Sequence, residues 1–536
     1  MRCQLFTSTV KDAKNKVCAS SLSTLKVSVN YTPGEFQALI RVYDEEAPSV
    51  IEHDVIVVIG AGPVGIYVTS LLLSKGYKVH LIEAGEEDFE SSFLTRDDYE
   101  FVSKSAMPTN VHRVGGGSNL WHARIGQFLS SDFEPLPELG IEGWPIKWNE
   151  LQQHYLKVIH ELVGEELTDE EFIREKYALQ KQIVNSQGLE LRLFRFADEY
   201  SFKKKYETLK QSSNLIVSTG NRVDEIATTQ SGNHEELSCI LTNESGRRKV
   251  IADRIIVAAG SMQSTKLILN SKDLHPPRQK NVAGTGLMEH MEGFVGVMKV
   301  SKSKNERLKL FLLNHKNRTV GSKSGFGIRL GTELIKEHSL TSFHVELRPL
   351  TRNIYQPKKL LRDRLPNPLH LIERIVKYVF SIVNQSKDFI CRQTSCGLWV
   401  KVEELRNSES IIRISTPEKM NKTLYKHLIL DESFEKLFVN LDLILQPMIQ
   451  IFESRVKLKG WVRRRIPNPN FGVNWHPMGT LSMGENPETA VCNKNLALHS
   501  NKKVFLLSAA VFNRGSNSNP TTTVLALASR LVEEQF

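Results

Sequence analysis

A glycine-rich stretch close to residue 60 has the spacing of a loop that binds the phosphates of a dinucleotide. Gly60, Gly62 and Gly65 follow the pattern G-x-G-x-x-G. The first glycine permits a tight turn, the second lets the backbone approach a pyrophosphate, and the third lets a helix pack closely on a sheet. Glu83 ends a strand-like run downstream, where its carboxylate can accept hydrogen bonds from a ribose diol. The spacing therefore predicts a dinucleotide site.

The elements that must position this loop can be read around it. Residues 55–59 are an uninterrupted run of Val and Ile, typical of a strand buried on both faces of a parallel sheet. A helix over 64–75 and a second strand over 78–82 would complete a βαβ unit. The helix N-terminus would then offer free N–H groups and the positive end of its dipole to the phosphates.

A second strand of this type lies far downstream, over 254–260, and a helix over 263–269 follows it. Paired strand-like runs at 215–217 and 237–242 precede it, so the sheet is expected to be assembled from separated segments. The glycine motif alone does not distinguish FAD from NAD. Two strands that both end in glycine look like the FAD-binding disulfide-reductase-type and oxidase-type folds, which favours FAD.

Three further stretches resemble the glucose–methanol–choline (GMC) oxidoreductase family, especially its bacterial-type branch. Residues 113–121 are similar to the loop that cradles the flavin, and residues 474–480 are similar to the H-P-x-G-T segment. Residues 507–528 resemble the closing pattern D-A-S-V-F … A-N-P-T-x-T … A-L-A. Shorter segments extend the resemblance from residue 54 to the C-terminus, although 291–465 match only in outline: 132–134, 143–145, 214–223, 258–269 and 286–290.

The resemblance implies which residues bind FAD. Glycines in the flavin loop would let backbone N–H groups approach the flavin where negative charge grows on reduction. Leu120 stands where the pyranose oxidase branch carries a covalently tethered histidine, so FAD is expected to bind non-covalently, and His122 is left without a role. Besides the first loop and Glu83, the implied FAD-binding residues are Gly115, Gly116, Gly117, Ser118, Asn119, Val223, Ala259, Gly260, Ser508, Ala509, Pro520 and Thr521.

Two residues are the implied catalytic pair, His476 and Asn519. Alcohol oxidation by a flavin needs a base for the hydroxyl proton, and imidazole titrates close to neutral pH. His476 is the candidate base, and Asn519 would hydrogen-bond the substrate oxygen. The expected activity is transfer of hydride from a CH–OH group of an alcohol, polyol or sugar to FAD. The sequence leaves three kinds of electron acceptor open: oxygen, a quinone or a redox protein.

One departure from the family pattern supports an alternative function. Ser508 replaces the aspartate before A-S-V, which removes a charge close to the flavin. A flavin-binding protein of the same fold, with lost or non-alcohol redox chemistry, therefore remains the second interpretation.

Composition excludes several other classes of protein. The chain has 536 residues, 24% of them charged, and a net charge of +10 scattered in short runs, so nucleic-acid binding is not expected. The 6 cysteines form no C-x-x-C pair, and no metal site is predicted. No apolar run is long enough for a membrane span, and no secretory signal is evident, which favours the cytoplasm.

The predicted fold class is α/β, or α+β overall. A Rossmann-like FAD-binding domain built from discontinuous segments is expected beside a substrate domain with an antiparallel sheet and helices. After an N-terminal extension at 1–50, the FAD-binding domain would take 51–140, 212–290 and 466–536. The substrate side would take a cap segment at 141–211 and a main domain at 291–465.

Overall fold

The computed structural model describes residues 55–88, 99–101, 111–197, 200–231, 234–274, 282–311, 324–349, 395–414, 423–468, 471 and 476–536. The chain divides into two compact units, Met1–Ser49 and Val50–Phe536, and every described residue belongs to the second. The predicted N-terminal extension therefore lies outside the described residues. None of the described helices is both long and apolar enough to cross a membrane.

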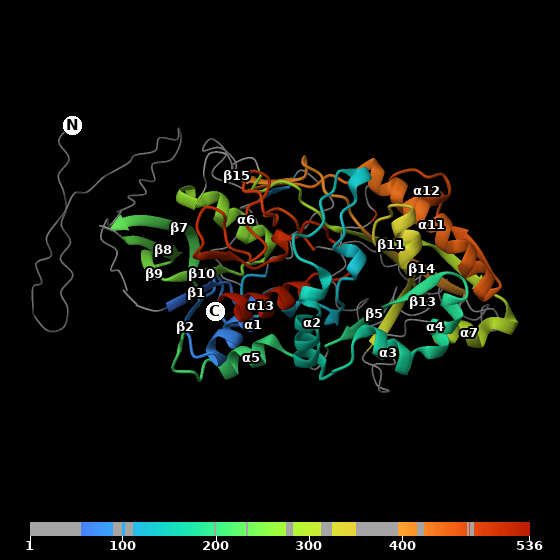
Figure 1. Cartoon of the computed structure of the whole chain (residues 1–536), viewed down its shortest axis with the longest axis horizontal. Coiled ribbons are helices and arrows are strands. Elements are labelled where there is room, and N and C mark those ends of the chain that lie inside the picture. Colours follow the sequence, from blue (N-terminus) through green and yellow to red (C-terminus); the bar gives the residue numbers. More distant parts are fainter. Residues whose placement is uncertain are drawn as a thin grey trace, which may run out of the picture. The chain divides into compact units, whose positions relative to one another are not determined.

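Helices and strands are interspersed along the described parts of the chain (Figure 1). The helices are α1 (Pro63–Ser74), α2 (Trp148–Val163), α3 (Asp169–Lys176), α4 (Ala178–Asn185), α5 (Phe202–Leu209), α6 (Gly260–Asn270), α7 (Asn305–Phe311), α8 (Thr332–Glu337), α11 (Asp431–Phe452), α12 (Gly460–Arg463) and α13 (Thr521–Gln535). The strands are β1 (Val55–Ile59), β2 (Lys78–Ile82), β3 (Tyr99–Phe101), β4 (Arg124–Ile125), β5 (Leu189–Phe196), β6 (Leu215–Ser218), β7 (Arg222–Ser231), β8 (His234–Asn243), β9 (Gly246–Ala252), β10 (Arg254–Val257), β11 (His290–Val300), β12 (Ser324–Leu330), β13 (Phe343–Pro349), β14 (Ser395–Glu403), β15 (Ile411–Ile414), β16 (Thr423–Lys426), β17 (Ser454–Leu458) and β18 (Val504–Leu506).

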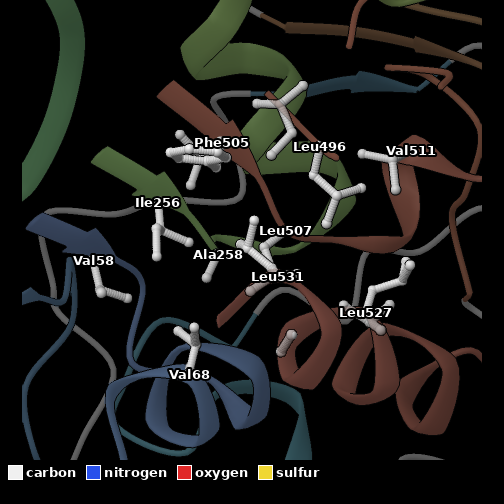
Figure 2. Packing of buried hydrophobic residues seen from close by; sticks show 14 of the residues in the cluster. Val58, Val68, Ile256, Ala258, Leu496, Phe505, Leu507, Val511, Leu527 and Leu531 are labelled. Carbon is white, nitrogen blue, oxygen red and sulfur yellow. The ribbon is translucent and has the colours of Figure 1, made fainter. Parts of the chain in front are cut away.

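A parallel five-stranded sheet forms the Rossmann-like part, in the order β18-β10-β1-β2-β6. All five residues of β1 are buried, as its unbroken Val and Ile run predicts. Helices α1 and α13 pack on this sheet, and Figure 2 shows Val68 and Leu531 facing Val58 and Ile256 in the shared core. The prediction of a parallel sheet assembled from distant segments is confirmed.

One detail of the predicted sheet is wrong. The runs at 215–217 and 237–242 do not pair with each other, because β6 pairs with β2 whereas β8 pairs with β7 and β9 in a separate three-stranded antiparallel sheet. Asn243 faces Gly246 across the tight turn between β8 and β9. Strands that are joined by short turns pair with their chain neighbours as hairpins. This local pairing places β8 outside the parallel sheet, although its sequence looks like that of a parallel strand.

A seven-stranded antiparallel sheet forms the second large layer, in the order β17-β11-β14-β13-β12-β5-β4. One face is apolar and packs in a single core with α11 and α7, through residues such as Val345, Val400 and Phe438. The remaining small sheet, β15-β16-β3, completes the described strands. The predicted antiparallel sheet with helices is present.

The segment at 141–211 is shared between the two large sheets. Residues of α2 and α5, including Tyr155 and Phe202, are buried in the core that contains α1 and α13. Strand β5, by contrast, belongs to the seven-stranded sheet. The domain boundaries given above stay a prediction.

Truncating the core beneath the parallel sheet tests this packing. Leu527 of α13 is 1% exposed in that core, so Leu527→Ala is expected to lower the free energy of unfolding by about 2–5 kcal/mol. Denaturant unfolding followed by far-UV circular dichroism measures this change. The matched control is Leu179→Ala, since Leu179 on α4 is 53% exposed and its truncation should change stability little. Equal losses in the two variants would contradict the packing.

Candidate active site

The carboxyl ends of four parallel strands border a cavity of about 1290 Å³. Gly60 follows β1, Glu83 follows β2, Ala258 follows β10 and Leu507 follows β18, and all four residues line this cavity. Open α/β sheets bind their ligands at this edge. On the opposite side, residues of the seven-stranded sheet complete the lining. The cavity therefore lies between the two large sheets.

The first glycine loop borders the cavity at the N-terminus of α1. Gly60 and Gly62 line it, and Gly62 is the N-cap of α1 without any side-chain cap, so helix N–H groups remain available to a ligand. Gly65 does not line the cavity. A Cβ at Gly65 would lie 1.8 Å from the carbonyl oxygen of Gly60, so this glycine permits the close packing of helix and strand.

Glu83 lies at the cavity edge and is 6% exposed. Its Oε2 accepts a hydrogen bond from the Ala61 N–H at 2.7 Å, and its Oε1 accepts one from the Gly85 N–H at 2.9 Å. Burial raises its pKa, and these two N–H groups oppose that rise. The carboxylate thus fixes the glycine loop, and each oxygen retains a lone pair for a ribose hydroxyl.

In the second loop, Gly116, Gly117 and Ser118 line the cavity, whereas Gly115 and Asn119 do not. Asn119 instead holds the turn together, because its Nδ2 donates to the carbonyl oxygens of Val114 and Gly116 at 3.0 and 2.9 Å. A Cβ at Gly116 would lie 3.0 Å from the Cα of Gly62, so the two glycine loops touch. Together they form one backbone cradle.

The other predicted FAD-binding residues all line the cavity. Ser508 is the residue that departs from the family pattern, and its Oγ accepts a hydrogen bond from the Ala510 N–H at 3.3 Å, which caps the short turn at Ala509–Val511 without a charge. Pro520 is the N-cap of α13, so the positive end of a second helix also borders the cavity. The set comprises Val223, Ala259, Gly260, Ser508, Ala509, Pro520 and Thr521.

His476 lines the cavity, and two residues that are adjacent in sequence, Glu289 and His290, contact it. Its Nδ1 lies 3.2 Å from Nδ1 of His290, and its backbone N–H donates to Oε2 of Glu289 at 2.8 Å. His290 Nε2 lies 3.0 Å from the carbonyl oxygen of Gly515. Burial, with the positive charge of Lys401, lowers the pKa of both imidazoles well below its usual value. Both rings are therefore neutral at pH 7.

Asn519 also lines the cavity, next to a lysine. Lys401 Nζ donates to Oδ1 of Asn519 at 2.8 Å. Lys401 is 2% exposed, and burial lowers its pKa to about 8, while Glu292 opposes this shift. The structure thus brings the two predicted catalytic residues to one cavity and adds an ammonium group beside them.

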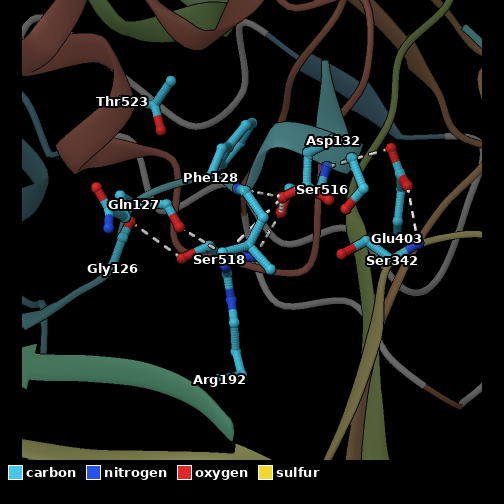
Figure 3. Close-up of polar contacts among 12 residues, drawn as sticks. Gly126, Gln127, Phe128, Asp132, Arg192, Ser342, Glu403, Ser516, Ser518 and Thr523 are labelled. Atoms are coloured by element: carbon cyan, nitrogen blue, oxygen red, sulfur yellow. Dashed lines mark hydrogen bonds and ion pairs between the residues drawn. The ribbon is translucent and has the colours of Figure 1, made fainter. Parts of the chain in front are cut away.

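The loop that carries Asn519 is fixed by buried polar contacts (Figure 3). Ser516 Oγ donates to Asp132 Oδ2 at 2.6 Å, and Ser518 Oγ donates to the carbonyl oxygen of Gly126 at 3.0 Å. Glu403 Oε2 of β14 accepts the Ser342 N–H at 3.0 Å, and its Oε1 accepts the Ser516 N–H at 3.3 Å. These bonds position Asn519 against the seven-stranded sheet.

The sequence reasoning missed several cavity-side residues, and five of them are ionisable side chains of the seven-stranded sheet. Four line the cavity and the fifth, His290, supports His476. A signal existed in β13 and β14, because apolar residues alternate there with His344, Glu346 and Arg348 and with Trp399 and Lys401. This alternation shows that one face is polar but does not show what it faces. The four lining residues are Arg124, Glu292, Arg348 and Lys401.

No group of His, Cys, Asp and Glu side chains in the described ranges is arranged to hold a metal ion.

Comparison with known proteins relates one segment of the chain to a protein family. Residues 458–528, which include His476 and Asn519, match the model of the GMC oxidoreductase family. This C-terminal part of the chain is similar to the GMC oxidoreductases. This similarity supports an oxidoreductase with FAD as its cofactor. No curated protein matches the sequence.

Solved structures share the fold at low sequence identity. Pyridoxine 4-oxidase from Mesorbium loti is 17% identical, with a TM-score of 0.55 over 90% of this chain and 98% of that one. A formate oxidase from Aspergillus oryzae RIB40 is 14% identical, with a TM-score of 0.56 over 90% and 98%. An FAD-dependent oxidoreductase from Chaetomium thermophilum is 14% identical, with a TM-score of 0.51 over 89% and 98%.

The cavity fits a bound dinucleotide. Two glycine loops expose backbone without side chains, and the N-terminus of α1 offers N–H groups to phosphates. Glu83 is placed to accept a ribose hydroxyl at the edge of β2. The residues present therefore match the demands of FAD.

Two glycine substitutions separate folding from cofactor binding. Gly65→Ala places a Cβ against the Gly60 carbonyl and is expected to lower the melting temperature, because helix α1 must move off the sheet. In contrast, a Cβ at Gly62 meets no atom within 4 Å, so Gly62→Ala should keep the melting temperature and lower the affinity for FAD. Thermal unfolding without added FAD and a flavin fluorescence titration measure the two effects. Reversed effects would contradict the roles given to the two glycines.

Proposed function

We propose that this protein is an FAD-dependent oxidoreductase that takes hydride from a CH–OH group of an alcohol, polyol or sugar, with His476 as general base. The observation that carries the proposal is the chain of hydrogen bonds behind His476, which ends at the carbonyl of Gly515. When bound, FAD supplies the hydride acceptor at flavin N5. The protein's own residues supply the base, the orientation of the substrate and the electrostatics.

The contacts behind His476 define its tautomer. The Gly515 carbonyl can only accept, so the neutral His290 carries its proton on Nε2 and leaves Nδ1 as an acceptor. Nδ1 of His476 must then donate to His290, which leaves Nε2 of His476 unprotonated. An unprotonated Nε2 can accept the proton of a substrate hydroxyl. His290 is thus a positioning residue that keeps His476 in the form of a base.

The lysine next to Asn519 defines the direction of its amide. An ammonium group only donates, so it must face the amide oxygen, and the Nδ2 hydrogens are left for other acceptors. These hydrogens can hold a substrate oxygen without competing for its proton. The Lys401 charge also favours negative charge on that oxygen as the proton leaves.

FAD would be held by the two glycine loops, by Glu83 and by the residues that follow β10 and β18. We expect non-covalent binding, since Leu120 occupies the position that is a histidine in the covalent branch. His122 lines the cavity but has no assigned role. The oxidation donor would be a small molecule, and a cytoplasmic location stays a prediction.

Replacing the base tests the reaction. His476→Ala is expected to slow flavin reduction by substrate about 10²- to 10⁴-fold, because the hydroxyl proton then lacks an acceptor. The flavin content should stay unchanged. Anaerobic stopped-flow absorbance with a panel of alcohols, polyols and sugars measures both quantities. The control is His160→Ala, an exposed histidine of α2.

Two outcomes of this experiment would argue against the proposal. Reduction of the variant at the unchanged rate would remove the role of His476. Stable FAD binding with no reduction of the original protein by any donor would favour the alternative, a flavin-binding protein of the same fold with lost or non-alcohol redox chemistry.

Lys401 predicts a pH dependence of the same step. Because its pKa is about 8, the Lys401 side chain carries a positive charge below this pH and loses the charge above it. His476 is neutral throughout this range and can act as a base. The rate of flavin reduction is therefore expected to fall as the pH rises through 8. Reduction rates between pH 6 and 10 test this. Lys401→Met should be slower at pH 7 and should lack the fall, and retention of the fall in this variant would contradict the assignment.

A further inference from the structure

Charged side chains cover the cavity face of the seven-stranded sheet. On β13, Val345 and Leu347 point into the apolar core, whereas His344, Glu346 and Arg348 alternate with them on the other face. Lys401 of β14 pairs with Glu292 of β11 and with His344 of β13. Burying charges is costly, so a polar face of this kind needs partners for each of them.

Glu346 is the anchor of this face and is 1% exposed. Its Oε1 lies 2.5 Å from Nη2 of Arg124 and 3.0 Å from Nε2 of His344. Its Oε2 accepts from Nε and Nη2 of Arg348 at 2.8 and 2.5 Å. Burial would raise the pKa of Glu346, but the two guanidinium groups hold it well below its usual value. One carboxylate therefore serves two arginines.

The charges on this face do not cancel. Lys401 lies 3.8 Å from Glu292, so this pair is balanced. Burial lowers the pKa of His344 to about 4, so its ring is neutral, as are those of His290 and His476. Arg124 and Arg348 share the single charge of Glu346. One positive charge therefore remains at the two arginines.

The two guanidinium groups are fixed and reach the cavity. Arg124 stacks on Phe194 with its Cζ 3.5 Å from the ring centroid, and Arg348 stacks on Trp399 at 4.3 Å. Both arginines line the cavity, with side chains that are 16% and 28% exposed. Each guanidinium has five N–H donors, and Glu346 takes only some of them. The remaining donors offer a planar fork to a ligand.

We propose that the substrate of this enzyme carries a carboxylate, which Arg124 and Arg348 bind while its hydroxyl lies at His476 and Asn519. This inference rests on the proposed function. A carboxylate can accept two parallel hydrogen bonds from the planar donors of a guanidinium group. Its single negative charge equals the one excess positive charge, whereas a phosphate dianion would leave a negative charge in the cavity. The donor would be a hydroxy acid of low molecular weight.

Calorimetric titration of the FAD-loaded protein with acetate tests the site without turnover. Acetamide serves as the neutral ligand of equal shape, and ionic strength is held constant. Acetate is expected to bind, and acetamide to bind at least about 10-fold more weakly, because hydrogen bonds between charged groups are the stronger ones. Arg348→Gln should weaken acetate binding about 10- to 100-fold. Arg348→Lys should weaken acetate binding less than Arg348→Gln does, since lysine keeps the positive charge.

Matched measurements keep the result interpretable. Lys157→Gln removes a positive charge from the exposed face of α2 and should leave acetate binding unchanged. Flavin content and melting temperature of each variant report folding. Equal binding of acetate and acetamide, unchanged acetate binding in Arg348→Gln, or equal binding of chloride and acetate would each overturn the inference. A change in flavin potential in Arg348→Gln without weaker acetate binding would also overturn it, because the charge would then serve the cofactor.

The two proposals fail in different ways. Specific acetate binding that depends on Arg348, with no flavin reduction by any alcohol or hydroxy acid, would leave the site in place and remove the proposed reaction. Reduction by neutral alcohols as fast as by hydroxy acids, with no effect of Arg348→Gln, would keep the reaction and remove the carboxylate site.

Discussion

The arrangement of the candidate site depends on one buried ion pair between Glu403 of β14 and Arg514 of the loop that precedes α13. Each side chain is 3% exposed, and Arg514 donates to both carboxylate oxygens, at 3.0 and 2.5 Å. Arg514 also donates to the carbonyl oxygens of Ser131 and Glu134. Removing one partner of such a pair typically costs about 3–5 kcal/mol, because it leaves an uncompensated buried charge. The pair therefore ties the loop firmly to the sheet.

The consequence of this link is that two layers with separate cores share one site. Gly515, next to Arg514 in the chain, supplies the carbonyl that orients His290, and Asn519 further along the same loop meets Lys401. A displacement of this loop would change the tautomer of His476 and the direction of the Asn519 amide together. The proposed base, His476, and the proposed substrate-orienting group, Asn519, are thus set by the same interaction.

Burial explains why these residues suit their proposed roles. A histidine in water is half protonated close to pH 6.5, whereas burial and the charge of Lys401 keep His476 neutral and able to accept a proton. Lys401 itself is charged at neutral pH even after burial, and Glu292 helps to keep it so. The site combines a neutral base with fixed positive charge, which favours loss of a hydroxyl proton.

The sequence by itself determined the nucleotide-binding half of this protein. The Val and Ile run of β1, the glycine spacing and the H-P-x-G-T and N-P-T segments are local patterns, and local patterns are set by the backbone geometry of a few neighbouring residues. They predicted the parallel sheet and indicated His476 and Asn519. The same reasoning placed Gly65, Gly115 and Asn119 at the cofactor, whereas they lie behind the cavity lining and hold the loops.

Only the tertiary structure decided which residues the seven-stranded sheet brings to the cavity and to its proposed base. Lys401, Arg348 and His290 come from strands that are distant in sequence, and antiparallel pairing alone brings them to one face. The alternation in β13 and β14 marks that face as polar but carries no information about its register or its partner. Strand pairing over such distances depends on the whole core, which explains why the charge of the cavity could not be read from the sequence.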